Sequence, residues 1–193
     1  QKKYPEAVKI LEKNIIGNFI LEDYRLYFLA TALKEMGKMY LENMKYGVAT
    51  QKFKKSIHNY FEVNKFYPES PFHSSLNGDI ANVERYLGDA YFMATNYKRA
   101  WQAYRRALMR KFQGDFNHRL EVRLALANTY REAGNLQEAY DIYAYLLSHD
   151  FGDPRVEKEI NEFILQYGNA IPDFINSLKK SIEDINKEGS EGN

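Results

Sequence analysis

The stretch YLGDAYFMATNYKRAWQAYRRAL, residues 86–108, decides the fold that we predict for this chain. Its apolar residues recur three and four positions apart, which is typical of amphipathic helices. Thr95 and Asn96 interrupt this spacing and indicate a turn. Gly88 precedes the turn and Ala100 follows it, twelve positions later. Because helices that cross closely need small side chains at the crossing, the stretch predicts an antiparallel helix pair.

The same pattern occurs three times along the chain. Each copy has a small residue, a tyrosine three positions later, an alanine after twelve positions, and an aromatic residue four positions beyond that alanine. The copies are Gly37, Tyr40, Ala49 and Phe53; Gly88, Tyr91, Ala100 and Tyr104; and Ala127, Tyr130, Ala139 and Tyr143. A single helix pair cannot bury its own apolar face, so repeated pairs stack on one another. The sequence therefore predicts an all-α array.

These residues resemble the tetratricopeptide repeat (TPR) family. The family pattern of Leu-Gly-x-x-Tyr followed by Ala-x-x-x-Phe/Tyr-x-x-Ala is carried here by Leu87, Gly88, Tyr91, Ala100, Tyr104 and Ala107. The early tryptophan of the family is missing from all three copies, and Glu84 holds its place in the middle copy. The copies are 51 and 39 residues apart, against a family period of about 34. The resemblance implies a right-handed superhelix of antiparallel helix pairs, an α-solenoid.

The helix signals and the resemblance together predict one helical domain over residues 1–187, followed by a disordered tail over 188–193. Within it we expect a half repeat at 4–20, repeats at about 30–66, 78–112 and 120–151, and a capping hairpin at 154–187. Asp153 and Pro154 predict a helix start, as an N-cap residue followed by proline. The extra residues between 60 and 78 predict a prolonged second helix and then an ordered loop, because aromatic residues are frequent there.

The start of the sequence and one internal run bear on the N-terminus and on the compartment of the protein. The chain opens with Gln1 and no secretory signal follows, so we expect a trimmed N-terminus. The stretch YPEA at residues 4–7 matches the start of a second helix, so its first-helix partner is expected upstream. The run FYPESPF at 66–72, continued by residues 86–108, is similar to bacterial periplasmic TPR proteins, including outer-membrane lipoproteins of envelope assembly. This likeness leaves the periplasm or cell envelope and the cytoplasm both open, and implies membrane contact only through a missing N-terminal anchor or a partner.

The composition excludes several kinds of chemistry. The chain of 193 residues has a net charge of +1 and no cysteine, which excludes disulfides and thiolate metal sites. Its histidines show no metal-ligand spacing, and they are His58, His73, His118 and His149. No glycine-rich phosphate loop and no nucleophile motif occur. The sequence predicts a protein that is not an enzyme and that holds no metal and no cofactor.

The resemblance implies a protein–protein interaction scaffold that binds a peptide or helical segment of another protein. In the family, the first helix of each repeat lines the concave groove. Carried over by register, the groove residues are Lys34, Lys38, Leu41, Arg85, Asp89, Phe92, Leu124, Asn128, Arg131 and Glu132. Among them, Phe92 and Leu124 are expected to be apolar anchors, and Lys34, Lys38, Arg85 and Arg131 are expected to bind acidic groups of the partner.

A rival interpretation is nucleic-acid or polyanion binding through the basic region 98–123. This region holds eight lysine and arginine residues against two acidic residues, and tyrosines beside them could stack on bases. Two observations disfavour it: the charge of the whole chain is nearly neutral, and Arg105 and Arg106 belong to a second helix, which usually faces outward in the family. The salt dependence of binding distinguishes the two interpretations, because phosphate binding weakens steeply as ionic strength rises.

Overall fold

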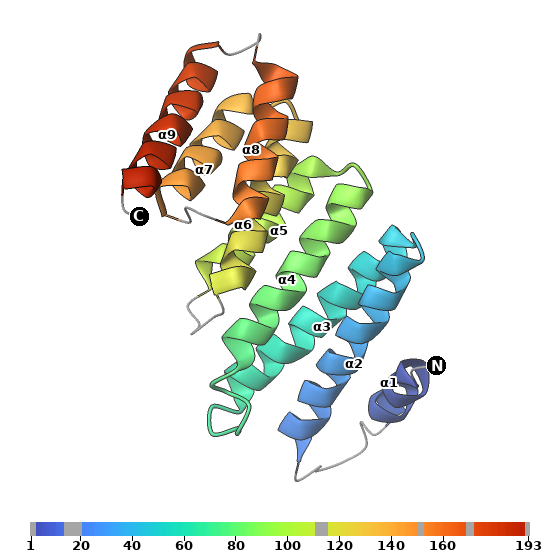
Figure 1. The fold of residues 1–193 in the computed structure, drawn as a ribbon. Coiled ribbons are helices and arrows are strands. Elements are labelled where there is room, and N and C mark those ends of the chain that lie inside the picture. Colours follow the sequence, from blue (N-terminus) through green and yellow to red (C-terminus); the bar gives the residue numbers. More distant parts are fainter. Residues whose placement is uncertain (1–2, 14–20, 111–115, 150–152, 169–171, 192–193) are drawn as a thin grey trace. The chain divides into compact units, whose positions relative to one another are not determined.

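The computed structural model describes residues 3–13, 21–110, 116–149, 153–168 and 172–191, and every regular element in these ranges is an α-helix. The helices are α1 (Tyr4–Lys13), α2 (Glu22–Glu42), α3 (Tyr46–Phe66), α4 (Leu76–Met93), α5 (Tyr97–Met109), α6 (Phe116–Glu132), α7 (Leu136–His149), α8 (Pro154–Tyr167) and α9 (Pro172–Glu191) (Figure 1). The prediction of an all-α protein is confirmed.

The chain divides into two compact units, which we describe separately. Unit 1 covers Gln1–Asp115 and unit 2 covers Phe116–Asn193. The division falls between the second and third predicted repeats. None of the described helices combines the length and the apolar character that crossing a membrane requires.

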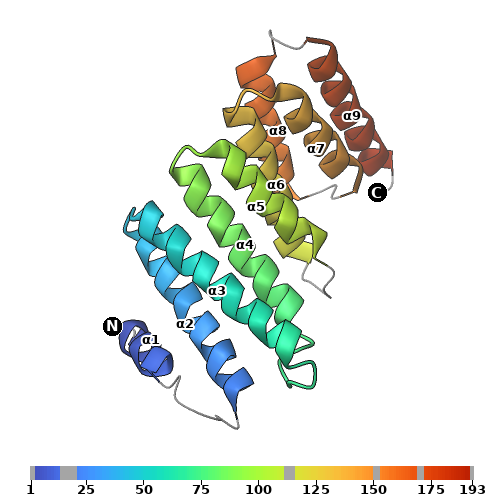
Figure 2. The same ribbon diagram turned by 180° about the vertical axis from the view of Figure 1, so that it is seen from behind.

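In unit 1 the helices follow one another side by side, as Figure 1 and the opposite view in Figure 2 both show. Helix α1 packs on α2, α2 pairs with α3, α3 packs on α4, and α4 pairs with α5. Val8 of α1 is buried against Leu29, Leu33 and Met36 of α2. This apolar contact is how the predicted half repeat joins the array, although residues 14–20 of that half repeat lie outside the described ranges.

The turns inside the three predicted pairs share one geometry. Met44, Thr95 and Gly134 stand at equivalent places and have φ angles of 57°, 56° and 78°. In each turn the next backbone N–H donates to the carbonyl of the repeat tyrosine, at 2.8 Å for Tyr40, 2.8 Å for Tyr91 and 2.9 Å for Tyr130. This bond is the mark of a helix end in a left-handed C-terminal cap. The turn predicted at Thr95 and Asn96 is confirmed, and the other two copies turn in the same way, although only one of the three turns has a glycine at this place.

The helices of unit 1 approach closely at two glycines. A Cβ atom placed on Gly88 would lie 2.5 Å from the Tyr104 ring of α5, and one on Gly37 would overlap the Phe53 ring of α3. The small residue therefore faces the aromatic residue of the second helix. The sequence pattern located the crossing correctly, but the nearest neighbour of Gly88 is Tyr104 rather than Ala100.

The extra residues between α3 and α4 are ordered, as predicted. Helix α3 continues to Phe66, and a series of turns leads to α4. Phe72 in this loop stacks on Tyr27 of α2, with ring centroids 3.9 Å apart and an interplanar angle of 6°. Ser70 in the loop is buried. The aromatic residues of the loop thus attach it to the start of α2.

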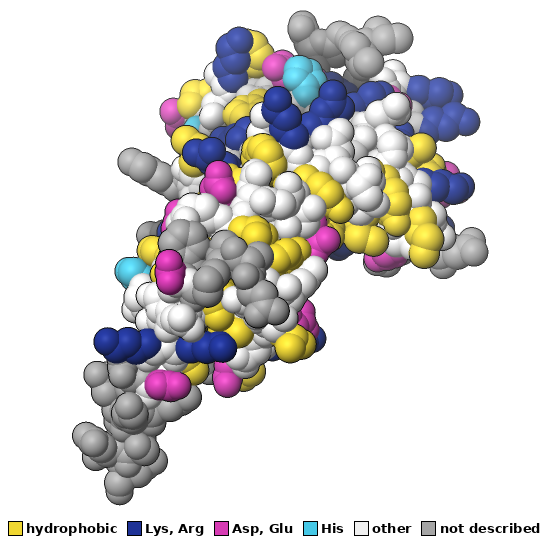
Figure 3. Space-filling model, turned by 90° about the horizontal axis from the view of Figure 1, so that it is seen from above, with side chains coloured by type: hydrophobic (Ala, Val, Ile, Leu, Met, Phe, Trp, Pro, Cys, Tyr) yellow, Lys and Arg dark blue, Asp and Glu magenta, His cyan; other side chains and the backbone are white. Residues whose placement is uncertain are grey.

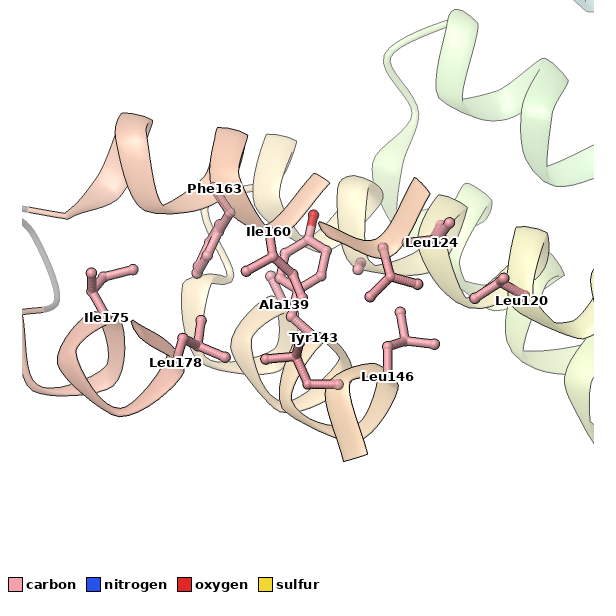
Figure 4. Close-up of a cluster of buried hydrophobic side chains, with 12 residues drawn as sticks. Leu120, Leu124, Ala139, Tyr143, Leu146, Ile160, Phe163, Ile175 and Leu178 are labelled. Carbon is pink, nitrogen blue, oxygen red and sulfur yellow. The ribbon is translucent and has the colours of Figure 1, made fainter. Parts of the chain in front are cut away.

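Unit 2 is built around one apolar core. Helices α6 and α7 pair, and α8 packs on both of them while α9 packs on α7. Leu120 and Leu124 of α6, Tyr143 and Leu146 of α7, and Ile160 and Phe163 of α8 meet in this core (Figure 4). The side chain of Asp153 accepts a hydrogen bond of 2.9 Å from the backbone N–H of Arg155, so the predicted N-cap is confirmed. Helix α9 extends to Glu191, beyond the predicted end at 187, because helix formers such as Lys187 and Glu188 continue it.

Candidate functional site

The predicted groove residues form stripes on three helices. Positions 34, 38 and 41 lie on α2, positions 85, 89 and 92 on α4, and positions 124, 128 and 131 on α6. Within each helix this spacing places the residues on one side. Helices α2 and α4 contact each other within unit 1, whereas α6 belongs to unit 2. We call the surface made by α2 and α4 the α2/α4 face, and its residues are Lys34, Glu35, Lys38, Leu41, Arg85, Tyr86, Asp89 and Phe92.

The cations of the α2/α4 face are paired with acidic residues of their own helix. Lys38 Nζ donates to Glu35 Oε2 at 3.1 Å, and Lys34 Nζ lies 4.0 Å from Glu35 Oε1. Arg85 Nη1 lies 3.5 Å from Asp89 Oδ2. Burial lowers the pKa of Lys38, but the hydrogen bond to Glu35 and nearby Tyr86 outweigh burial and raise that pKa above its ordinary value. Lys38 is therefore cationic at neutral pH.

Tyr86 connects the two helices of this face. The Lys38 ammonium of α2 lies 5.4 Å from the centre of the Tyr86 ring, and the Arg85 guanidinium lies 4.3 Å from it. The ring also stacks on Phe53 of α3, at 5.9 Å between centroids. Sequence reasoning missed Tyr86, because it stands one position outside the stripe of α4. The face is thus a strip of alternating charges around an aromatic centre.

Two predicted groove residues hold buried tyrosines in place. The hydroxyl of Tyr104 donates to Asp89 Oδ1 at 2.7 Å, and the hydroxyl of Tyr143 donates to Asn128 Oδ1 at 2.7 Å. Both acceptors directly follow the small residue of their repeat. The first copy has Phe53 at the aromatic place and Lys38 at the acceptor place, so neither the hydroxyl nor the acceptor is present there. This joint change of two positions is a signal in the sequence that reveals the structural role of Asp89 and Asn128.

Replacing Tyr104 by phenylalanine should make stability less sensitive to alkaline pH. Burial, together with Asp89, raises the pKa of the Tyr104 hydroxyl above its ordinary value of 10.0. The folded protein therefore keeps this proton above pH 10 while the unfolded chain loses it, so stability is complete below pH 10 and falls as pH rises further. Tyr104→Phe should weaken that fall and cost about 1.5–3 kcal/mol at neutral pH, the usual contribution of a hydrogen bond to a charged group.

The measurement is urea unfolding of the wild-type chain and of Tyr104→Phe at a series of alkaline pH values. Tyr143→Phe is the matched variant in unit 2, because burial also raises the pKa of Tyr143. An alkaline loss of stability that is equally steep with and without the Tyr104 hydroxyl would contradict the prediction.

The predicted groove residues of unit 2 differ from those of unit 1. Leu124 is only 8 % exposed and points into the core with Leu146 and Ile160, as Figure 4 shows. The expectation of a surface anchor at Leu124 is therefore corrected, because α8 packs on α6 and covers this part of the helix. Arg131 is 13 % exposed and lies 3.3 Å from Glu132 and 3.6 Å from Glu159 of α8. Arg131 thus holds α6 to α8.

The basic region 98–123 is distributed over both units. Arg99, Arg105 and Arg106 belong to α5 of unit 1, whereas Arg119 and Arg123 belong to α6 of unit 2. Lys111 lies outside the described ranges. Figure 3 shows basic side chains beside acidic and apolar ones on the face that it draws. The basic residues that are continuous in sequence thus belong to two separate units.

The α5 part of this region borders a cleft of about 460 Å³ between α3, α4 and α5. We call it the basic cleft. Helix α3 contributes Lys54, Ile57 and Phe61, α4 contributes Glu84, Leu87 and Tyr91, and the α5 segment contributes Arg99, Gln102, Arg106 and Arg110. Sequence reasoning did not connect Lys54 or Glu84 with the basic region, because nothing in the chain near α5 points to them.

A buried carboxylate lies in the wall of the basic cleft. Glu84 is 2 % exposed and receives two hydrogen bonds of 3.2 Å from Arg110, while Arg106 Nε lies 3.3 Å away. Glu84 stands where the TPR pattern has its early tryptophan. Arg106 of α5 and Arg110, which directly follows α5, pair with its carboxylate, so this position is a charged connection between α4 and the α5 segment.

Within the described ranges, no group of three His, Asp or Glu side chains is placed to hold a metal ion. A scan against protein-family models and a search of curated proteins gave no match to this chain.

Proposed function

We propose that this protein is a non-catalytic protein–protein interaction scaffold that binds a segment of a partner protein on the α2/α4 face. The observation that carries this proposal is the direct contact of α2 and α4, which join their stripes through Lys38 and Tyr86. A TPR-like right-handed superhelix of the helix pairs is part of the same proposal. It rests on the repeated turn geometry and on the repeated contact of a small residue with an aromatic ring.

The chemistry of the face suits an extended or helical peptide with acidic and apolar residues. Tyr86 and Phe92 supply aromatic surface, and aromatic residues with arginine contribute most of the energy in many interfaces. Lys34, Lys38 and Arg85 pair with carboxylates one turn away or less on their own helix. Such partly exposed pairs contribute only about 0.3–0.5 kcal/mol each. A carboxylate of the partner can therefore replace Glu35 or Asp89 at little cost.

The class of partner to test first is a bacterial envelope protein. The support is the likeness of residues 66–72 and 86–108 to periplasmic TPR proteins. Phe72 of the first run lies on Tyr27 at the start of α2, so the run is attached to the helix that provides the face.

We expect Lys38→Ala combined with Phe92→Ala to weaken partner capture by about 2 kcal/mol, roughly thirtyfold in affinity, as for truncated interface anchors. The full chain is immobilised, proteins are captured from a periplasmic and outer-membrane extract of the native organism, and the enriched protein is identified by mass spectrometry. Its affinity for each variant is then measured with purified components.

The matched control is Lys65→Ala combined with Met109→Ala. It also removes one lysine and one apolar side chain, but both are exposed and lie outside the α2/α4 face. Helical content measured by circular dichroism verifies that both double variants remain folded. Equal affinity of the wild-type chain and the Lys38/Phe92 variant would refute the assignment of the face.

A further inference from the structure

The basic cleft collects positive charge from two helices that are not paired with each other. Lys54 comes from α3, and Arg99, Arg106 and Arg110 come from the α5 segment. Four cations thus surround one carboxylate, that of Glu84. Its volume of about 460 Å³ falls in the range of small-molecule sites. The excess of cations makes the cleft attractive to a compact anion.

Lys54 and Arg99 converge on the same aromatic ring. The Lys54 ammonium lies 5.7 Å from the centre of the Tyr91 ring, and the Arg99 guanidinium lies 5.8 Å from it. Among the residues that the structure describes, neither cation has an acidic partner. Both cations line the basic cleft from different helices, so an anion bound in the cleft would be attracted to each of them. This convergence is the strongest sign of a ligand.

The guanidinium groups of the cleft are positioned before any ligand binds. Glu84 and the Phe61 ring, 4.8 Å from the Arg110 guanidinium, hold Arg110 from two sides. Arg106 Nε lies 3.3 Å from Glu84, and the Arg106 side chain is 48 % exposed, so its guanidinium group is accessible to a ligand in the cleft. The planar guanidinium group matches the oxygens of phosphate in paired hydrogen bonds.

We infer that the basic cleft binds a small anion with two or more phosphate groups. Each phosphate group carries about −1.5 to −2 charges at neutral pH, so two of them balance the cations of a cleft of this size, Glu84 included. A nucleic acid fits less well, because base stacking needs free aromatic faces. In the cleft, Tyr91 and Phe61 already carry cations on their rings.

The test is isothermal titration calorimetry of the full chain with inorganic tripolyphosphate at fixed, moderate ionic strength. The variants are Lys54→Gln and Arg99→Gln, whose side chains hold no acidic residue in place. Each should weaken tripolyphosphate binding roughly tenfold, the usual effect of losing one charge-assisted contact. The control is Arg105→Gln, which removes the same charge from an exposed position of the same helix outside the cleft. It should leave the affinity nearly unchanged.

The other arms of the experiment decide the class of ligand. Citrate tests a tricarboxylate, and a single-stranded oligonucleotide tests nucleic acid. Tripolyphosphate binding that only the cleft variants weaken supports the inference. The inference is overturned if the wild-type chain binds no tripolyphosphate, if Arg105→Gln weakens binding as much as Arg99→Gln, or if citrate or the oligonucleotide binds more tightly than tripolyphosphate. None of these outcomes depends on partner capture by the α2/α4 face.

Discussion

Replacing Gly88 by leucine should destabilise unit 1 by about 3 kcal/mol, the upper range for forcing extra volume into a packed interior. Even the first carbon of a side chain at this position would lie 2.5 Å from the Tyr104 ring. That ring has little room to move, because it is 2 % exposed and its hydroxyl is bound to Asp89. A local adjustment therefore cannot relieve the clash, and α4 and α5 are forced apart.

The control for this prediction is Gly47→Ala. A Cβ atom on Gly47 would meet nothing within 4 Å, and the residue lies in the first turn of α3. Alanine is the better helix former by about 1 kcal/mol, so Gly47→Ala should leave stability unchanged or raise it slightly. Urea unfolding followed by circular dichroism measures both variants. A Gly88→Leu protein that is as stable as Gly47→Ala would show that the two helices do not cross closely at this position.

Replacing Phe163 by alanine should destabilise unit 2 by about 3–5 kcal/mol, the range for truncating a buried phenylalanine. Phe163 is fully buried, and its ring centre lies 5.1 Å from that of Tyr143 of α7. Ile160 and this ring, both of α8, lie among buried side chains of α6 and α7, as Figure 4 shows. The resulting cavity lies between α7 and α8, and neither helix can close it alone.

Leu165→Ala is the matched control on the same helix, because Leu165 is 89 % exposed. It should change the free energy of unfolding by less than about 0.5 kcal/mol. Amide hydrogen exchange then shows which helices each substitution destabilises. For Phe163→Ala we expect faster exchange in α6 to α9. Unaltered exchange in α7 would contradict the view that α8 is an integral part of this core.

Both predictions depend on features that could be recognised in the sequence to different degrees. The spacing of Gly88 and the repeat tyrosines indicated where two helices cross. Helix periodicity also indicated α8, and Asp153 with Pro154 indicated its start. No pattern indicated that Phe163 would lie on Tyr143, since the two helices that carry them are joined by residues with no repeat spacing.

The candidate sites show the same division between local pattern and tertiary contact. The stripes of the α2/α4 face could be carried over by register, because three equivalent helices place equivalent positions on one side. The burial of the residues in these stripes could not be predicted from register. Leu124 and Phe92 were both carried over as apolar groove residues, yet α8 covers the α6 helix that carries Leu124, and Phe92 is only partly buried beside Tyr97.

The position at which the TPR pattern has its early tryptophan illustrates why register alone is insufficient. In the three copies it holds Leu33, Glu84 and Arg123. Leu33 is fully buried, Glu84 is buried between two arginines, and Arg123 stacks on Tyr145 at 4.7 Å. The three equivalent positions thus make three different kinds of contact: apolar, ionic and cation–π.

The sequence by itself determined the helices, their pairing and the turns between them, because periodicity, small residues and turn conformation act over a few neighbouring positions. The left-handed turns at Met44, Thr95 and Gly134 follow from this local chemistry. Only the tertiary structure decided which side chains meet across stacked pairs. Lys54 and Arg99 lie far apart in the chain and share Tyr91 only because α3 and α5 both pack on α4.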